Sequence, residues 1–114
     1  MNLNHYTNLE IAKKMDKLGW IKRTEHYHCI PTEVGEKGRL KHISAPLATE
    51  ILEELPKAFN QDDLHLNIDF ENEEIYCVNY INIHTEITEY SIQNKSFVDA
   101  LGEMWCLLKK KGII

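Results

Sequence analysis

The chain has 114 residues, with 13 Lys or Arg and 18 Asp or Glu, which gives a formal net charge of −5. With 43% hydrophobic and 27% charged residues, the composition is typical of a globular domain and excludes a disordered polyampholyte. No apolar run approaches the roughly 20 residues of a membrane-spanning helix, and the first residues lack the pattern of a secretory signal. We therefore expect a single domain over residues 1–114 with no membrane partner.

The three cysteines, Cys29, Cys77 and Cys106, are odd in number and widely spaced. A secreted disulfide framework usually has an even number of cysteines, so this pattern favours reduced thiols in the cytoplasm. Isolated cysteines in apolar segments are usually small core residues, and we assign all three to that role.

Charge is distributed unevenly along the chain. Residues 1–45 carry 8 basic and 5 acidic side chains, whereas residues 46–94 carry Lys57 alone against 11 acids. Broad nucleic-acid binding needs clustered Lys and Arg, so we expect no direct nucleic-acid partner. The favoured interpretation of the acids is solvated positions on helices and turns, and the alternative is a negative surface that attracts a basic protein partner. An alternative is an acidic DNA-mimic inhibitor, which needs one continuous surface formed by Glu50, Glu53, Glu54, Asp62, Asp63, Asp69 and Glu71.

Three segments with apolar residues on one helical face predict helices, at residues 7–19, 46–55 and 96–111. The first begins with the spacing of a capping box, Thr7 to Glu10, and ends at Gly19, where a left-handed cap is favoured. The last begins with a similar spacing, Ser96 to Asp99.

Five segments have strand character, at residues 20–30, 39–43, 64–70, 75–84 and 87–92. In 64–70 apolar and polar residues alternate strictly, which predicts a sheet with one wet face. Together the elements predict an α+β fold, a two-layer antiparallel sheet of about four to five strands packed against two to three helices. We expect the helices at 46–55 and 96–111 on one face of the sheet, and the helix at 7–19 over an edge or on the other side.

The segment with the most chemical character contains His26 and His28. On a strand these two side chains share a face and lie about 7 Å apart, and with a third ligand they could hold zinc. His42 supplies that ligand if the strands at 20–30 and 39–43 pair with residue numbers summing to 68 or 70, but not if the sum is 69. The sequence leaves this register open. A metal site at His26, His28 and His42 is therefore the alternative interpretation, and half-exposed strand histidines are the favoured one.

The sequence carries no motif for nucleophilic or phosphate-binding chemistry. Gly-x-Ser-x-Gly is absent, and the cysteines and histidines show no local catalytic pattern. Gly35 and Gly38 belong to an expected hairpin loop that lacks the P-loop pattern. We therefore expect a protein that is not an enzyme and needs no cofactor.

Aromatic residues mark a candidate interface. Tyr76, Val78 and Tyr80 share one face of the expected central strand, and the intervening apolar residues lie mostly on the other. If the helices cover only one of these sets, the other forms a patch of the kind that marks association. We assign the candidate interface to Tyr76, Val78, Tyr80 and Trp20, with a second copy of the chain as one expected partner.

Two segments carry a resemblance, Leu47-Ala48-Thr49-Glu50-Ile51-Leu52-Glu53-Glu54-Leu55-Pro56 and Ala100-Leu101-Gly102-Glu103-Met104-Trp105-Cys106-Leu107-Leu108. With the expected strand pair between them, they resemble a group of small uncharacterised proteins carried by phages and prophages of low-GC bacteria. The resemblance covers roughly residues 44–114 and consists of packing patterns. It implies a phage-related setting and a compact α+β shape, and it transfers no site residue.

These observations favour a non-enzymatic accessory or regulatory module that acts through protein–protein contact. The identity of the protein partner stays open. A metal- or small-ligand-binding protein that uses the His-rich hairpin, and the DNA mimic, remain the alternatives.

Overall fold

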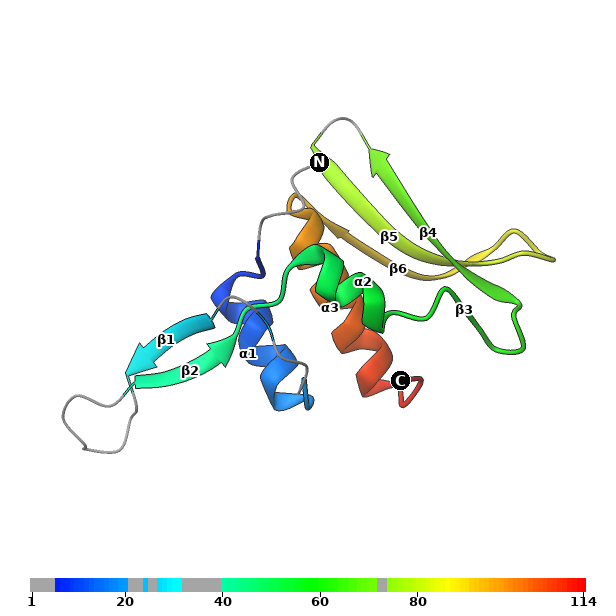
Figure 1. The fold of residues 1–114 in the computed structure, drawn as a ribbon. Helices are drawn as coiled ribbons and strands as arrows, with labels where there is room; N and C mark the ends of the chain where they lie inside the picture. The colour runs from blue at the N-terminus through cyan, green and yellow to red at the C-terminus, as the bar shows by residue number, and fades with distance from the viewer. Residues whose placement is uncertain (1–5, 21–23, 25–26, 32–39, 72–73) are drawn as a thin grey trace.

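The computed structural model describes residues 6–20, 24, 27–31, 40–71 and 74–114. These ranges form three helices and two antiparallel sheets, which confirms the α+β class predicted from the sequence (Figure 1). In chain order the elements are α1 (Leu9–Lys17), β1 (Tyr27–Pro31), β2 (Leu40–Ser44), α2 (Ala48–Glu54), β3 (Ala58–Phe59), β4 (Leu64–Glu71), β5 (Ile75–Asn82), β6 (Thr88–Asn94) and α3 (Phe97–Lys110).

Four strands form the main sheet in the order β3-β4-β5-β6, with neighbours antiparallel. Leu66 lies opposite Tyr80, and Val78 lies opposite Ile92. Because side chains alternate along a strand and directly opposite residues share a face, these four side chains lie on the same face of the sheet. β1 and β2 pair separately as a two-stranded sheet.

The helices lie on one side of the main sheet (Figure 1). α3 packs against β5 and β6, while α1 and α2 pack against α3. The helices expected at 46–55 and 96–111 therefore lie on the same side, but α2 contacts chiefly α3 rather than the strands. Within the described ranges, every helix is too short or too polar to serve as a bilayer-spanning segment.

The hydrophobic core lies between α3 and the main sheet. Its fully buried members come from both layers, with Val78 and Tyr80 from β5 and Leu101, Met104 and Leu108 from α3. Aliphatic and aromatic side chains of this size each stabilise the fold by about 1.5–3 kcal/mol when they leave water. The helices cover this face of β5, and no described helix covers the other face.

The start of α1 differs from the predicted capping box. The N-cap residue is Asn8, whose side-chain oxygen accepts the Ile11 N–H at 2.9 Å. Asp99, in the first turn of α3, accepts the Asn8 backbone N–H at 2.8 Å and the Asn8 side-chain amide at 3.0 Å. Thr7, which the spacing predicts as the cap, is buried just before the helix. The two helices are thus joined at their N-terminal ends.

Of the described residues in the strand predicted over 20–30, those from Tyr27 onward belong to β1. Trp20 instead follows α1 into the core. The Trp20 ring meets the Trp105 ring edge-on, with ring centroids 5.2 Å apart. Residues 21–23 and 25–26 lie outside the described ranges.

Candidate functional site

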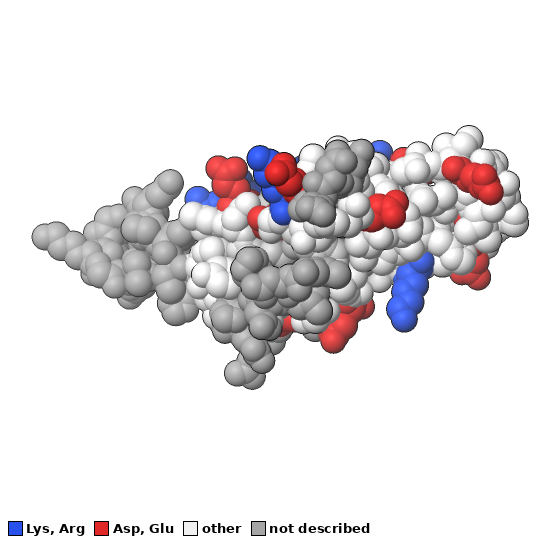
Figure 2. Space-filling view, turned by 90° about the horizontal axis from the view of Figure 1, so that it is seen from above, with Lys and Arg blue, Asp and Glu red and all other residues white. Residues whose placement is uncertain are grey.

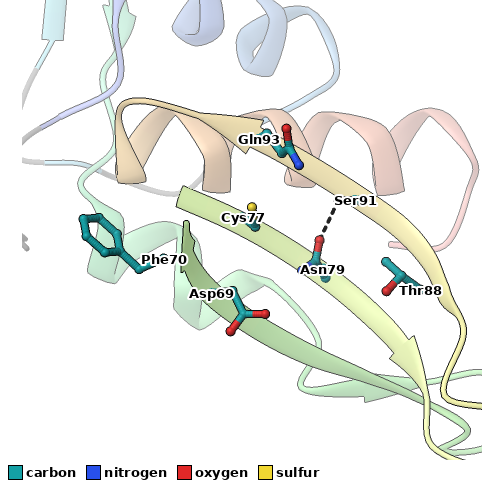
Figure 3. A pocket seen from close by; sticks show the side chains of 7 residues that line it. All are labelled: Asp69, Phe70, Cys77, Asn79, Thr88, Ser91 and Gln93. Carbon is teal, nitrogen blue, oxygen red and sulfur yellow. Dashed lines mark hydrogen bonds between the residues drawn. The ribbon is translucent and has the colours of Figure 1, made fainter. Parts of the chain in front are cut away.

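The face of the main sheet opposite the helices carries polar side chains. By the pairing register, Asp69 of β4 lies beside Cys77 of β5, and Asn79 of β5 lies beside Ser91 of β6. These positions alternate with the core residues, so they point to the side away from α3. Figure 3 shows Asp69, Cys77, Asn79 and Gln93 side by side on the three strands. We call this surface the open face.

A shallow hollow of about 640 Å³ lies on the open face, lined by Asp69, Phe70, Cys77, Asn79, Thr88, Ser91 and Gln93. The Ser91 hydroxyl donates a hydrogen bond to the Asn79 side-chain oxygen at 2.6 Å (Figure 3). At the β4 side, the Asn67 amide donates to the Asp69 carboxylate at 3.1 Å. The hollow therefore presents amide and hydroxyl groups, with a carboxylate at its side.

The candidate interface predicted at Tyr76, Val78, Tyr80 and Trp20 needs correction. Val78, Tyr80 and Trp20 are buried inside this chain, and Tyr76 is partly covered, with its ring centroid 5.4 Å from that of Phe97. The physical reason is that α3 packs on this face of β5, so the apolar set became the core. Cys77 and Asn79 lie on the other side of β5, which no described helix covers, although both are buried by their neighbours.

The hairpin histidines are not assembled into a site by the described residues. His28 lies opposite Ile43, and His42 lies opposite Cys29, so the numbers of paired residues sum to 71. An odd sum places positions 28 and 42 on opposite faces of the two-stranded sheet. His28 Nε2 is instead 2.7 Å from the Thr7 carbonyl oxygen. His26 and the side chain of His42 lie outside what the structure describes. A metal site at His26, His28 and His42 therefore stays a prediction.

Groups that could act in acid–base chemistry lie elsewhere in the described ranges. His84 contacts the Asp63 carboxylate at 2.9 Å, and the His65 ring contacts the Asp62 carbonyl oxygen at 2.8 Å, both at the exposed loop end of the sheet. No cluster of three or more His, Cys, Asp or Glu with metal-binding geometry is found among the described residues. The open face presents hydrogen-bonding groups from Asp69, Asn79, Ser91 and Gln93.

The acidic side chains do not gather on one surface of the described molecule. Glu53 and Glu54 are exposed on α2, on the helix side, whereas Asp69 belongs to the open face. Figure 2 shows acidic and basic side chains scattered over one view, separated by broad uncharged areas. This distribution disfavours the DNA-mimic alternative, which needs continuous negative charge.

The outer edge of β4 is a second exposed feature, which we call the β4 edge (residues 67–70). Ile68 is 37% exposed and Phe70 is 51% exposed, although both belong to the face that α3 covers further along the sheet. A smaller hollow of about 200 Å³ lies here, lined by Ile68, Asp69, Phe70 and Tyr76.

Sequence reasoning did not single out the residues of the open face. The alternation in 64–70 does predict a wet face containing Asn67 and Asp69. Asn79 interrupts an otherwise apolar strand, and a polar residue in a central strand is a signal for that same face. Gln93 lies beyond the predicted end of its strand.

Comparisons with known proteins found no relative of this chain. No protein-family model matches the chain, and no curated protein and no solved structure matches it significantly.

Proposed function

We propose that this chain is a non-enzymatic accessory or regulatory module that binds another protein, with the open face as the contact surface. The observation that carries the proposal is the amide- and hydroxyl-lined hollow on a sheet face that no described helix covers. Small-molecule pockets are usually concave and mostly apolar with a few converging polar groups. A shallow polar surface favours a broad partner that brings its own backbone and side-chain hydrogen-bonding groups.

The arrangement of charge on the open face supports a protein partner. Asn79, Ser91 and Gln93 are uncharged, and the carboxylate of Asp69 lies to one side of them. Protein interfaces have few charged residues at their centre and a polar rim. Asn79 is itself buried by its neighbours and bonded to Ser91, which holds its amide in a fixed orientation.

Further parts of the proposal rest on the sequence. The buried thiols Cys77 and Cys106 support action in the cytoplasm. The resemblance of residues 44–114 to phage-borne proteins supports a phage-related setting, with a host or phage protein as the partner. A second copy of the chain is one candidate partner for the open face.

The test is a comparison of two substitutions of the same type. Gln93→Arg enlarges and charges a side chain in the hollow, whereas Gln61→Arg makes the same change in the exposed turn between β3 and β4. A partner captured from the source organism is purified and its affinity is measured by calorimetry. We expect Gln93→Arg to weaken binding about tenfold or more, because it crowds a contact centre, and Gln61→Arg to leave it unchanged. Equal affinities for the two variants would overturn the proposal.

A further inference from the structure

The β4 edge carries backbone hydrogen-bonding groups in a defined pattern. The Leu66 N–H donates to the Lys57 carbonyl at 2.9 Å, on the side of β4 away from β5. Because backbone groups alternate between the two sides of a strand, those of Ile68 and Phe70 point to that same outer side. β3 pairs only with the first two residues of β4. Within the described ranges, no strand pairs with the outer side of β4, the side away from β5, beyond them.

Apolar side chains flank these outward backbone groups. Ile68, Phe70 and Tyr76 share the helix-side face of the sheet, and together with Asp69 they line the hollow of about 200 Å³. The ring centroids of Phe70 and Tyr76 are 4.6 Å apart. A strand added to this edge would therefore place apolar side chains next to Ile68 and Phe70, which are half-exposed without it.

Between these two residues, Asp69 presents a carboxylate on the other face. In an antiparallel pair whose hydrogen bonds run through Ile68 and Phe70, Asp69 directly opposes one residue of the added strand at a Cβ separation of about 4.5–5.5 Å. An opposite charge at this position is favourable and a like charge is unfavourable. The net charge of −5 on the whole chain adds long-range attraction for a basic segment.

We propose that the β4 edge binds an extended segment of a partner protein, with Lys or Arg opposite Asp69 and apolar residues opposite Ile68 and Phe70. Addition of a strand to an exposed sheet edge is a recurring mode of peptide recognition, in which backbone bonds give affinity and alternate side chains give specificity. The inference rests on the proposed function, because the bound segment is part of a partner protein. The segment would bind the edge of the sheet and not the open face.

A second copy of this chain fits the β4 edge poorly. Two-fold antiparallel pairing centred on the free backbone groups would set Asp69 directly against its own copy. The neighbouring register, centred on Ile68, sets Phe70 of the second copy against Leu66, whose N–H already bonds to Lys57. Like charge disfavours the first arrangement, and the existing hydrogen bond disfavours the second. The basic segment meets neither obstacle.

The opposite edge of the sheet provides a matched comparison. β5 residues of even number bond to β6, as the 2.9 Å bond from the Asn82 N–H to the Ile87 carbonyl shows. The backbone groups of Ser91 and Gln93 therefore point outward at the β6 edge. Their side chains are polar, and the described β6 edge has no counterpart of the Ile68–Phe70 pair.

The experiment uses the whole chain and two capped seven-residue peptides. In one peptide valines flank a central arginine, and in the other glutamate replaces the arginine. Binding is followed by NMR. We expect the arginine peptide to bind about three- to tenfold more tightly, because opposite and like cross-strand charges have opposite effects. Bound peptide should slow amide hydrogen exchange at Ile68 and Phe70, whose N–H groups point to the edge, and not at Ser91 and Gln93.

A charge reversal tests the assigned contact. Asp69→Lys should reverse the preference so that the glutamate peptide binds more tightly. Glu74→Lys makes the same change of charge at an exposed position in the turn between β4 and β5, and it should keep the preference for arginine. Ile68→Pro removes an outward N–H that no strand of the described residues pairs with, and proline is tolerated at such an edge. It should abolish binding, whereas Gln93→Pro on the β6 edge should not.

Four results would overturn the inference. They are equal binding of the two peptides, an equal effect of Asp69→Lys and Glu74→Lys, slowed exchange at the β6 edge, and a dimer of the chain alone that protects the Ile68 and Phe70 amides. None of these results affects the Gln93→Arg test of the open face. Loss of partner binding in Gln93→Arg with no peptide bound at the β4 edge would leave the proposed function standing and remove this inference.

Discussion

At the scale of single residues, Cys106 is expected to make the fold less stable as the pH becomes alkaline. Burial raises the pKa of its thiol from 9.0 to about 11; Lys110 and Lys14 pull it down, and Glu103 pushes it up. The unfolded chain therefore loses this proton at lower pH than the folded chain does. Stability from this group is complete below about pH 9 and falls as the pH rises through the window between 9.0 and about 11.

The measurement is the free energy of unfolding in urea from about pH 8 to about pH 10. Burial also raises the pKa of Tyr80 above its ordinary value of 10.0, so the lower part of this range separates the two groups. Cys106→Ala should lose stability overall and flatten the decline. An identical slope in the variant and the parent chain would contradict the assignment to Cys106.

Asp99 shows why single residues are hard to predict from local spacing. The sequence pattern correctly indicates Ser96 as the residue that begins α3, and the Ser96 hydroxyl accepts the Asp99 N–H at 3.4 Å. The Asp99 carboxylate, however, bonds to Asn8, which is 91 positions away in the chain. A capping pattern considers only partners a few residues away in the chain. The partner of the Asp99 carboxylate comes from tertiary packing and lies outside that range.

At the scale of elements, the contact between α1 and α3 depends on the small size of Gly102. A Cβ added there would lie 2.6 Å from the Ile11 Cγ2 atom and 3.3 Å from the Met15 sulfur. Overpacking of this kind costs about 1–3 kcal/mol, and alanine returns up to about 1 kcal/mol through its higher helix propensity. We expect Gly102→Ala to lower the free energy of unfolding by roughly 1–2 kcal/mol.

A double-mutant cycle locates the cause of this loss. Ile11→Ala removes the atom that the new Cβ would meet, so Gly102→Ala should cost less in that background. The helix-propensity gain of Gly102→Ala is the same in both backgrounds, so it cancels in the cycle. A cost of Gly102→Ala that is the same with and without Ile11 would show that the close approach is not the cause.

Most elements could be predicted from the sequence, but their mutual arrangement could not. The apolar periodicity indicates all three helices, and the alternation in 64–70 indicates β4, because both patterns are local. β3 has two residues and is too short to show a pattern. The two sides of β5 both contain apolar residues, so the sequence left open which side α3 covers. That choice determined the candidate site.

At the scale of the whole molecule, the β1–β2 hairpin extends the fold beyond its core. The radius of gyration is 15.5 Å, whereas a compact chain of this length has about 13 Å. The hairpin contacts the rest chiefly through β2 and α1, with Ile43 as a buried anchor. The hydrophobic core, in contrast, joins β5 and α3 over the length of the sheet.

Segments with few buried contacts open locally at lower free energy than the core does. We therefore expect the amides of β1 and β2 to exchange with deuterium through an opening that costs about 2 kcal/mol or more less than the opening of β5. Val78→Ala, which leaves a cavity in the core, should lower the opening free energy of β5 and leave that of the hairpin unchanged. Native-state exchange followed by NMR measures both. Equal opening free energies in the hairpin and β5, both lowered by the same amount in Val78→Ala, would contradict this expectation. Because only a shared transition moves all amides by the same amount, that result would mean that the hairpin unfolds as one unit with the sheet and α3.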